Sequence, residues 1–165
     1  MHDVTIGERP DVRLTGFEHR GPYHGIGATF DRLAAWAAPR GLLGSGARCF
    51  GVYYGNPNLV APEDLRAFAG LVLPTPVPLP AKPQPAEPPQ DDAETIDVPG
   101  GPCAVLVHQG DYRELEGVHR WLYGTWFPGS GHRPDPGRPC CEEYLNDPRS
   151  LPPADWLTRI TAPLR

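Results

Sequence analysis

The chain has 165 residues, of which 15 are Lys or Arg and 20 are Asp or Glu, so its formal net charge is −5. Proteins that bind nucleic acid through a broad basic face need an excess of Lys and Arg to replace counterions, and the composition argues against that class. No apolar run approaches the roughly 18 residues that span a bilayer. Residues 1–10 contain no apolar stretch typical of a secretory signal. We therefore expect a cytoplasmic protein that contacts neither a membrane nor nucleic acid directly.

Cysteine spacing gives no sign of a metal site or of a disulfide framework. The adjacent pair Cys140 and Cys141 cannot easily close a strain-free disulfide, and no CxxC pair is accompanied by a histidine. Reduced, partly buried thiols are the expectation for a cytoplasmic chain. Because no phosphate-loop or serine-hydrolase motif is evident either, we expect neither a metal ion nor a cofactor.

The first half of the chain predicts two strands, a helix and two more strands. Runs of apolar and β-branched residues predict the strands at 4–6, 12–19, 48–54 and 67–73. Between the second and third runs, apolar residues recur at steps of four, three and four, which places them on one helical face. These residues are Ile26, Phe30, Leu33 and Ala37. Gly41 follows them, where a glycine that ends a helix is expected.

A proline-rich segment comes next and divides the chain. Eight prolines lie between Pro74 and Pro89, and acidic residues follow them. Such a segment cannot form a helix or a central strand, so residues 74–95 are predicted to be an extended, semi-rigid linker. The predicted domain organisation is thus a single domain, 1–165, made of a first repeat at 1–73, the linker at 74–95 and a second repeat at 96–165.

The second half repeats the order of the first. Strands are predicted at 96–98, 104–108, 140–145 and 157–162, and a helical stripe precedes the third of them. The stripe consists of Leu115, Val118, Leu122 and Trp126. Local matches also recur at nearly one offset: 21–23 corresponds to 110–112 at an offset of 89, and 53–57 corresponds to 144–148 at an offset of 91. We interpret this as an internal duplication.

The predicted fold class is therefore α+β, with duplicated ββαββ halves related by a pseudo-two-fold axis. Antiparallel sheets that join or face each other, two main helices and a central cleft at the junction follow from this arrangement.

One acid stands out within the duplication. Side chains alternate along a strand, so Glu142 and Tyr144 share a face and Glu143 points the other way, toward solvent. The equivalents in the first half are Gly51 and Tyr53. A glycine opposite an acid leaves room for a ligand, and the acid can pair with a cation, accept a hydrogen bond or act as a base. The alternative is that Glu142 is an exposed carboxylate on an edge strand.

Aromatic side chains near this acid suit a site for flat, apolar or cationic molecules. Trp126, next to Gly124, is the favoured ligand contact, and Trp36 is a further candidate. Ordinary core or surface packing is the alternative for both. His19 and His108 end equivalent strands, and a structural role is expected for them.

Three segments together resemble the GyrI-like family. They are residues 17–23, read as FEHRGPY, residues 50–53, read as FGVY, and residues 141–148, read as CEEYLNDP. This family includes DNA gyrase inhibitors and the effector-binding domains of AraC-type and MerR-type multidrug regulators. The resemblance covers nearly the whole chain, and the proline-rich linker is the main departure from it.

The resemblance implies an SHS2-like fold of the SOUL/GyrI-like superfamily, with a cleft for aromatic or cationic small molecules. It implies that Glu142 faces this cleft, with Tyr53, Tyr144 and Trp126 as contacts. A stand-alone binding protein for hydrophobic compounds, serving drug or toxin resistance, is the first expectation. A hydrolase that opens the cyclopropane ring of DNA-alkylating natural products, with Glu142 as general base, is the alternative. A protein-interaction module that acts on gyrase is the second alternative.

Overall fold

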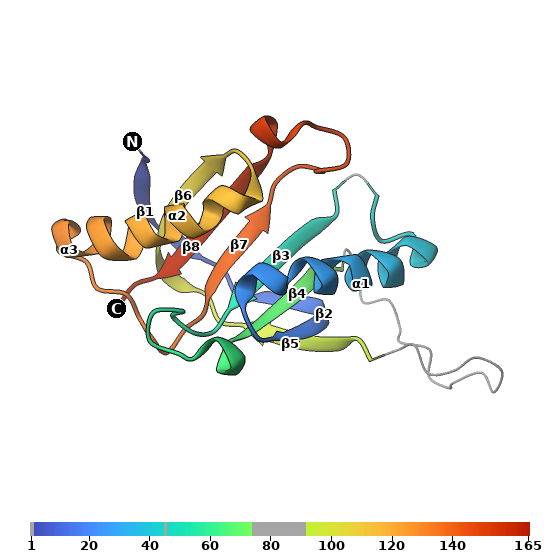
Figure 1. Cartoon of the computed structure of the whole chain (residues 1–165), viewed down its shortest axis with the longest axis horizontal. Coiled ribbons are helices and arrows are strands. Elements are labelled where there is room, and N and C mark those ends of the chain that lie inside the picture. Colours follow the sequence, from blue (N-terminus) through green and yellow to red (C-terminus); the bar gives the residue numbers. More distant parts are fainter. Residues whose placement is uncertain (1, 45, 74–91) are drawn as a thin grey trace.

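The structure, a computed structural model, describes residues 2–44, 46–73 and 92–165 (Figure 1). Most of the predicted linker, 74–91, therefore lies outside the described residues, and strand β5 begins at Glu94. The strands are β1 (Val4–Arg9), β2 (Val12–Arg20), β3 (Arg48–Tyr53), β4 (Arg66–Val72), β5 (Glu94–Val98), β6 (Gly101–Gln109), β7 (Cys140–Tyr144) and β8 (Leu157–Pro163). The helices are α1 (Gly27–Ala37), α2 (Leu115–Trp121) and α3 (Phe127–Ser130), with a π-helical turn, Leu122–Trp126, between α2 and α3.

The α+β class with an antiparallel sheet is confirmed. Within the described residues, all eight strands join one sheet in the order β1-β6-β8-β7-β3-β4-β2-β5. Each half of the chain contributes two strands, a helix and two strands, and the strand order reads the same from either end when the halves are exchanged. This order agrees with the predicted repeat, while descent of the two halves from one duplicated unit stays a prediction.

The centre of the sheet is the antiparallel pair β3 and β7. Its register places Gly51 directly opposite Glu142, so Tyr53 and Tyr144 lie two residues beyond this pair on their own strands. Because directly paired residues have their side chains on the same face, the register defines one row of side chains across the sheet. The row consists of Leu106, Ile160, Glu142, Gly51, Ala69 and Phe17.

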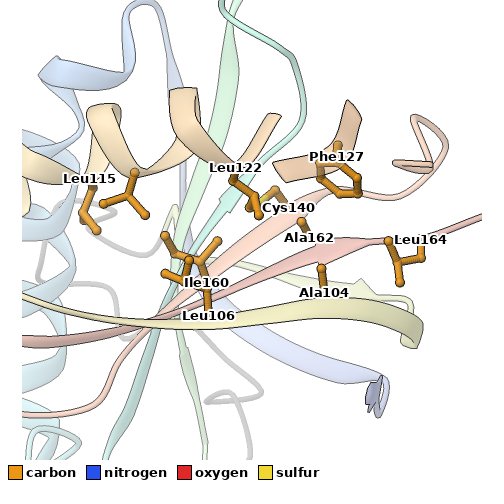
Figure 2. Packing of buried hydrophobic residues seen from close by; sticks show 10 residues of the cluster. Ala104, Leu106, Leu115, Leu122, Phe127, Cys140, Ile160, Ala162 and Leu164 are labelled. Carbon is orange, nitrogen blue, oxygen red and sulfur yellow. The ribbon is translucent and has the colours of Figure 1, made fainter. Parts of the chain in front are cut away.

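Helix α1 and the helical segment from α2 to α3 cover the same face of the sheet, on either side of this central pair (Figure 1). Leu33 and Ala37 of α1 pack on Phe17, Ala69 and Leu71. In the second half, Leu115, Val118, Leu122 and Phe127 pack on residues of β6, β8 and β7, including Leu106 and Ile160 (Figure 2). The apolar rows under α1 and α2 therefore flank Glu142.

The opposite face of the sheet is also buried, because the ends of the sheet curl toward each other. Only Pro10 and Asp11 join β1 and β2, although five strands lie between them in the sheet. The connection between β5 and β6 is equally short, and five strands lie between them as well. The two turns touch: the Gly100 amide donates to Asp11 Oδ1 at 2.7 Å, and a Cβ on Gly100 would lie 2.1 Å from the Arg9 carbonyl oxygen. Gly100 is thus needed for this close approach.

Buried side chains on this second face form a separate apolar cluster. Its members are Leu14, Phe50, Val52, Phe68, Val98 and Cys141. All four cysteines are free thiols, as expected. No helix in the described part of the chain is both long and apolar enough to cross a membrane.

The helical stripe of the second half changes register at its end. The sequence spacing predicts that Trp126 follows Leu122 into the core. Instead the Phe127 amide donates to the Leu122 carbonyl, five residues back, and the π turn brings Phe127 into the core. Trp126 is only partly buried, and its ring stacks on His132 with 5.9 Å between centroids. Trp126 thus packs at the margin of this core, and Phe127 takes the fully buried position.

We predict that Phe127→Ala lowers the free energy of unfolding by about 3–5 kcal/mol, the usual cost of a large-to-small change in a core. Trp126→Ala is expected to cost clearly less, because its ring is partly exposed. Chemical denaturation of both variants measures the difference. A larger loss for Trp126→Ala would mean that the regular stripe, rather than the π turn, describes the core.

Candidate functional site

Glu142 lies at the centre of the sheet, on the face covered by the helices, and is almost completely enclosed. Only 4% of its surface is exposed. Three side chains donate to its two oxygens. The hydroxyls of Tyr53 and Tyr144 reach Oε2 at 3.1 and 2.8 Å, and His119 Nε2 reaches Oε1 at 2.6 Å. The acid is therefore buried at the sheet centre, which excludes the alternative of an exposed carboxylate on an edge strand.

The two tyrosines come from equivalent strand positions and converge on one carboxylate oxygen. Their hydroxyls are also 3.2 Å apart, so they form a closed triangle with Glu142. Burial and then the negative charge of Glu142 raise the pKa of both Tyr53 and Tyr144 well above the usual value. Both hydroxyls consequently stay protonated at neutral pH and can only donate to the acid.

His119 supplies the third contact and is the site residue that the sequence analysis missed. Burial pulls the pKa of His119 down, but its hydrogen bonds to, and electrostatic interactions with, Cys140 and Glu142 outweigh burial and raise it to about 10. At neutral pH the contact is therefore an ion pair between an imidazolium and a carboxylate. The sequence contained a signal for this residue. His119 lies four residues after Leu115, a step of about one helical turn, and at an offset of 89 it corresponds to Phe30 of the first helical stripe.

Aromatic rings surround the triangle on both sides. Tyr23 lies against Tyr53, with 4.9 Å between ring centroids, and Tyr112 lies against Tyr144 at 5.2 Å. From the helices, Phe30 of α1 contacts Tyr144 at 5.3 Å edge to face, and His119 of α2 faces Tyr53 at 6.3 Å. Tyr123, one turn after His119, stacks nearly parallel to the imidazole ring.

Gly51 has a different role from the one predicted. A Cβ at Gly51 would lie 2.9 Å from the Tyr53 hydroxyl and 3.0 Å from the Tyr144 hydroxyl. The space above this glycine is thus filled by the two hydroxyls that bind Glu142, rather than left open for a ligand. The glycine allows the triangle to form.

The two predicted tryptophans lie in other surroundings. Trp126 contacts Phe127 and His132, at the far end of the second helical segment. Trp36 packs edge to face on Phe17, and the Arg40 guanidinium lies over its ring. The aromatic contacts of both tryptophans described above are made with residues outside the triangle, and their part in ligand binding stays a prediction.

Glu143 was expected to face solvent, and that expectation is wrong. It lies on the opposite face of the sheet with 8% of its surface exposed, held by Arg48 and Arg159 at 2.8 Å each. These arginines come from β3 and β8, on either side of β7, so ion pairs of Glu143 connect all three strands. His19 has a structural role: its ring nitrogens contact Thr29 Oγ1 and the Pro22 carbonyl.

Two buried polar atoms next to the triangle make no hydrogen bond among the described residues, Tyr112 Oη and Thr158 Oγ1. His108 Nε2 is also buried, and it lies 3.2 Å from Glu114 Oε2. Thr158 is the cross-strand neighbour of both Tyr144 and His108. No set of three His, Cys, Asp or Glu side chains within the described ranges is arranged to hold a metal ion.

Comparison with known proteins identifies the family. A model of the GyrI-like small molecule binding domain matches residues 2–165. The chain belongs to the GyrI-like family. The DNA gyrase inhibitor of Edwardsiella piscicida is 36% identical over 155 residues, covering 88% of this chain and 87% of that protein. The DNA gyrase inhibitor of Erwinia billingiae is 32% identical over 151 residues, with the same coverage.

Solved structures of GyrI-like fold extend the comparison at low sequence identity. The EcmrR C-terminal domain superposes with a TM-score of 0.69 at 15% identity, covering 100% of this chain and 98% of that one. SAV2435 bound to tetraphenylphosphonium gives a TM-score of 0.63 at 12% identity, covering 99% and 94%. A hydrolase encoded by lin2189 from Listeria innocua gives 0.58 at 15% identity, covering 98% and 91%. At this identity the likeness concerns the fold.

We predict that Gly51→Ala lowers the free energy of unfolding by roughly 1–3 kcal/mol, the usual cost of overpacking. The added methyl group must push apart the hydroxyls of Tyr53 and Tyr144. Gly7→Ala in β1 is the matched control, because a Cβ there meets nothing within 4 Å. Equal stability of the two variants in chemical denaturation would show that the space above Gly51 is open.

We also predict that His119 stays charged throughout the neutral range. Its pKa of about 10 lies above the value of about 6.5 for an unfolded chain, so the pair stabilises the fold below pH 6.5 and this contribution is lost as the pH rises through 10. Imidazole ¹⁵N shifts measured against pH report the charge directly. Glu142→Gln should bring the midpoint down markedly. A wild-type midpoint near 6.5 would contradict the ion pair.

Proposed function

We propose that the chain captures aromatic or cationic hydrophobic compounds at the Glu142 site, between α1 and α2, as a stand-alone binding protein. The observation that carries the proposal is a buried carboxylate surrounded by the rings of both halves. Stacking on tyrosine faces and cation–π contacts suit flat or cationic ligands, and the acid supplies the counter-charge. Protection of the cell from drugs or toxins by sequestration is the role that such capture would serve.

The symmetric strand order supports a single acid at the centre of the sheet. Because Gly51 and Glu142 are direct partners across the central strand pair, acids at both positions would repel each other, whereas one acid receives a tyrosine from each half. We therefore propose that the central cleft of the predicted fold opens here. Since Glu142 is covered in this conformation, a ligand must displace side chains of α1 or α2 to reach it.

Ring-opening hydrolysis is the second candidate, and the ion pair of His119 with Glu142 favours it. An imidazolium 2.6 Å from a carboxylate places an acid beside a base, as general acid–base catalysis needs. Both oxygens of Glu142 are engaged here, so the acid can activate water only after one donor leaves. Substrates of this class would be strained cyclopropanes activated by a conjugated carbonyl, with a tyrosine hydroxyl stabilising the developing oxyanion.

A gyrase-directed interaction module is the third candidate, and the identity of 32–36% to proteins named DNA gyrase inhibitor favours it. Such a function would use an exposed surface. Substitutions within the Glu142 triangle would then leave it unchanged if the fold is kept.

Tetraphenylphosphonium is a suitable probe for capture, since the structurally similar SAV2435 binds it. We predict that the wild-type protein binds this cation and that Glu142→Gln weakens binding by roughly tenfold or more, because a charge-assisted contact is lost. Glu116→Gln, at an exposed position of α2, is the matched control and should bind like the wild type. Isothermal titration calorimetry gives the affinities.

No binding by the wild-type protein, or equal binding by wild type and Glu142→Gln, would overturn the proposed site. In parallel samples with a cyclopropane-containing alkylator, a product heavier by one water would favour hydrolysis over capture. Loss of that product in Glu142→Gln would assign the base.

A further inference from the structure

The charge balance of the site differs from that of a bare acid. Glu142 carries one negative charge, and the His119 imidazolium lies 2.6 Å from it. Two arginines, Arg48 and Arg159, form ion pairs with the neighbouring Glu143 on the opposite face of the sheet. Within the described part of the chain, the pair of Glu142 and His119 is therefore neutral. The negative charge that a cationic ligand would need is therefore already neutralised by His119.

His119 also lies on the solvent side of the acid. Its side chain is 25% exposed, whereas that of Glu142 is 5% exposed. It is located in the last turn of α2, three residues before Leu122, where the π turn begins. π turns are frequent at functional sites. The imidazole thus covers Glu142 from a helical segment whose hydrogen-bond pattern changes immediately after it.

In the first half of the chain, an uncharged ring stands at the helix position that corresponds to His119. Phe30, at an offset of 89 from His119, contacts the ring of Tyr144 edge to face at 5.3 Å. The fold therefore accommodates an apolar ring at this position of the helix. A charged ring in only one of the two helices accompanies the single acid.

On the basis of the proposed function, we propose that His119 is an internal counter-cation that a cationic ligand displaces from Glu142, so that binding of the cation releases a proton. The ligand replaces one positive charge by another beside the acid. Once moved away from Glu142, the imidazole loses the interaction that keeps it protonated. The only covalent bond that breaks is an N–H bond of the imidazolium, and its proton passes to water or buffer. His119 acts through Glu142 as a residue that sets the charge selectivity of the site.

Several titratable groups face His119 and could take part in proton exchange. They are Glu142 and Cys140 of β7, Tyr53 of β3 and Tyr123 of the π turn. Burial raises the pKa of both Tyr53 and Tyr123, so these hydroxyls stay neutral up to pH 9. Cys140 is the remaining neighbour of His119 outside the Glu142 triangle, and it needs its own control variant.

The linkage has a definite sign. In the ligand-free protein His119 is paired with Glu142 and has a pKa of about 10, whereas a displaced imidazole has a pKa near 6.5. Between pH 7 and pH 9 the two states therefore differ by almost one bound proton. Proton release then makes the cation bind about tenfold more tightly for each unit of pH in this interval. Near pH 5.5 the displaced imidazole keeps its proton, and release should disappear.

The test is calorimetric titration of the full chain with tetraphenylphosphonium at pH 8, in phosphate and in Tris, whose ionisation enthalpies differ. We expect about one proton released per cation bound by the wild type and by Cys140→Ser. Two variants remove the charge: His119→Phe, which copies Phe30, and His119→Gln, which keeps a hydrogen-bond donor. Both should release no proton and, at pH 7, bind the cation roughly tenfold or more tightly than the wild type. Neutral triphenylphosphine oxide should bind the wild type without proton release.

The outcomes separate this inference from the proposed function. Binding by the wild type without proton release, or with an affinity that His119→Phe and His119→Gln leave unchanged or weaken, overturns the role of His119 and leaves the site in place. Proton release that disappears in Cys140→Ser but persists in both His119 variants also overturns it. Absence of binding by the wild type and by all variants overturns the proposed function itself.

Discussion

A buried carboxylate at the centre of the sheet is the constraint on which the rest of the site depends. An isolated charge in such a place costs several kcal/mol unless hydrogen bonds and an opposite charge compensate it. Glu142 receives two hydroxyls and an imidazolium, and each donor comes from a different element: β3, β7 and α2. The acid therefore fixes how the two halves meet, and whatever replaces one of its donors must satisfy the same demand.

The same demand connects the fold with ligand binding. Apolar rows under α1 and α2 leave the central pair of strands as the place where polar groups gather, and Gly51 gives the two hydroxyls their space. A ligand with a positive charge and aromatic rings can take the place of the imidazolium and of the rings that surround Glu142 in this structure. Binding is then an exchange of partners around Glu142 rather than the filling of an open cavity.

The order of the elements along the chain was predictable because it follows from periodicity. Alternation along residues 140–145 and the offset of 91 to Gly51 placed Glu142 on one face with Tyr144, but its burial at the sheet centre became clear only from the strand order. Three features were not predictable in this way. The π turn adds one residue to the helix, and the spacing does not indicate that Phe127 is more deeply buried than Trp126. Glu143 is buried because arginines of β3 and β8 bracket it, a contact that depends on sheet order. His119 does not follow from the helical stripe, because such a stripe is defined by apolar residues alone.

A crystal structure of the protein with tetraphenylphosphonium tests the central claim most directly. The account predicts that phosphorus lies over Glu142, that phenyl rings contact Tyr53 and Tyr144, and that His119 Nε2 no longer lies within hydrogen-bond distance of Oε1. A cation bound elsewhere, for example in the surface hollow of about 250 Å³ lined by Tyr54, Val98 and Pro136, would contradict it, provided that the contact of His119 with Glu142 stays intact.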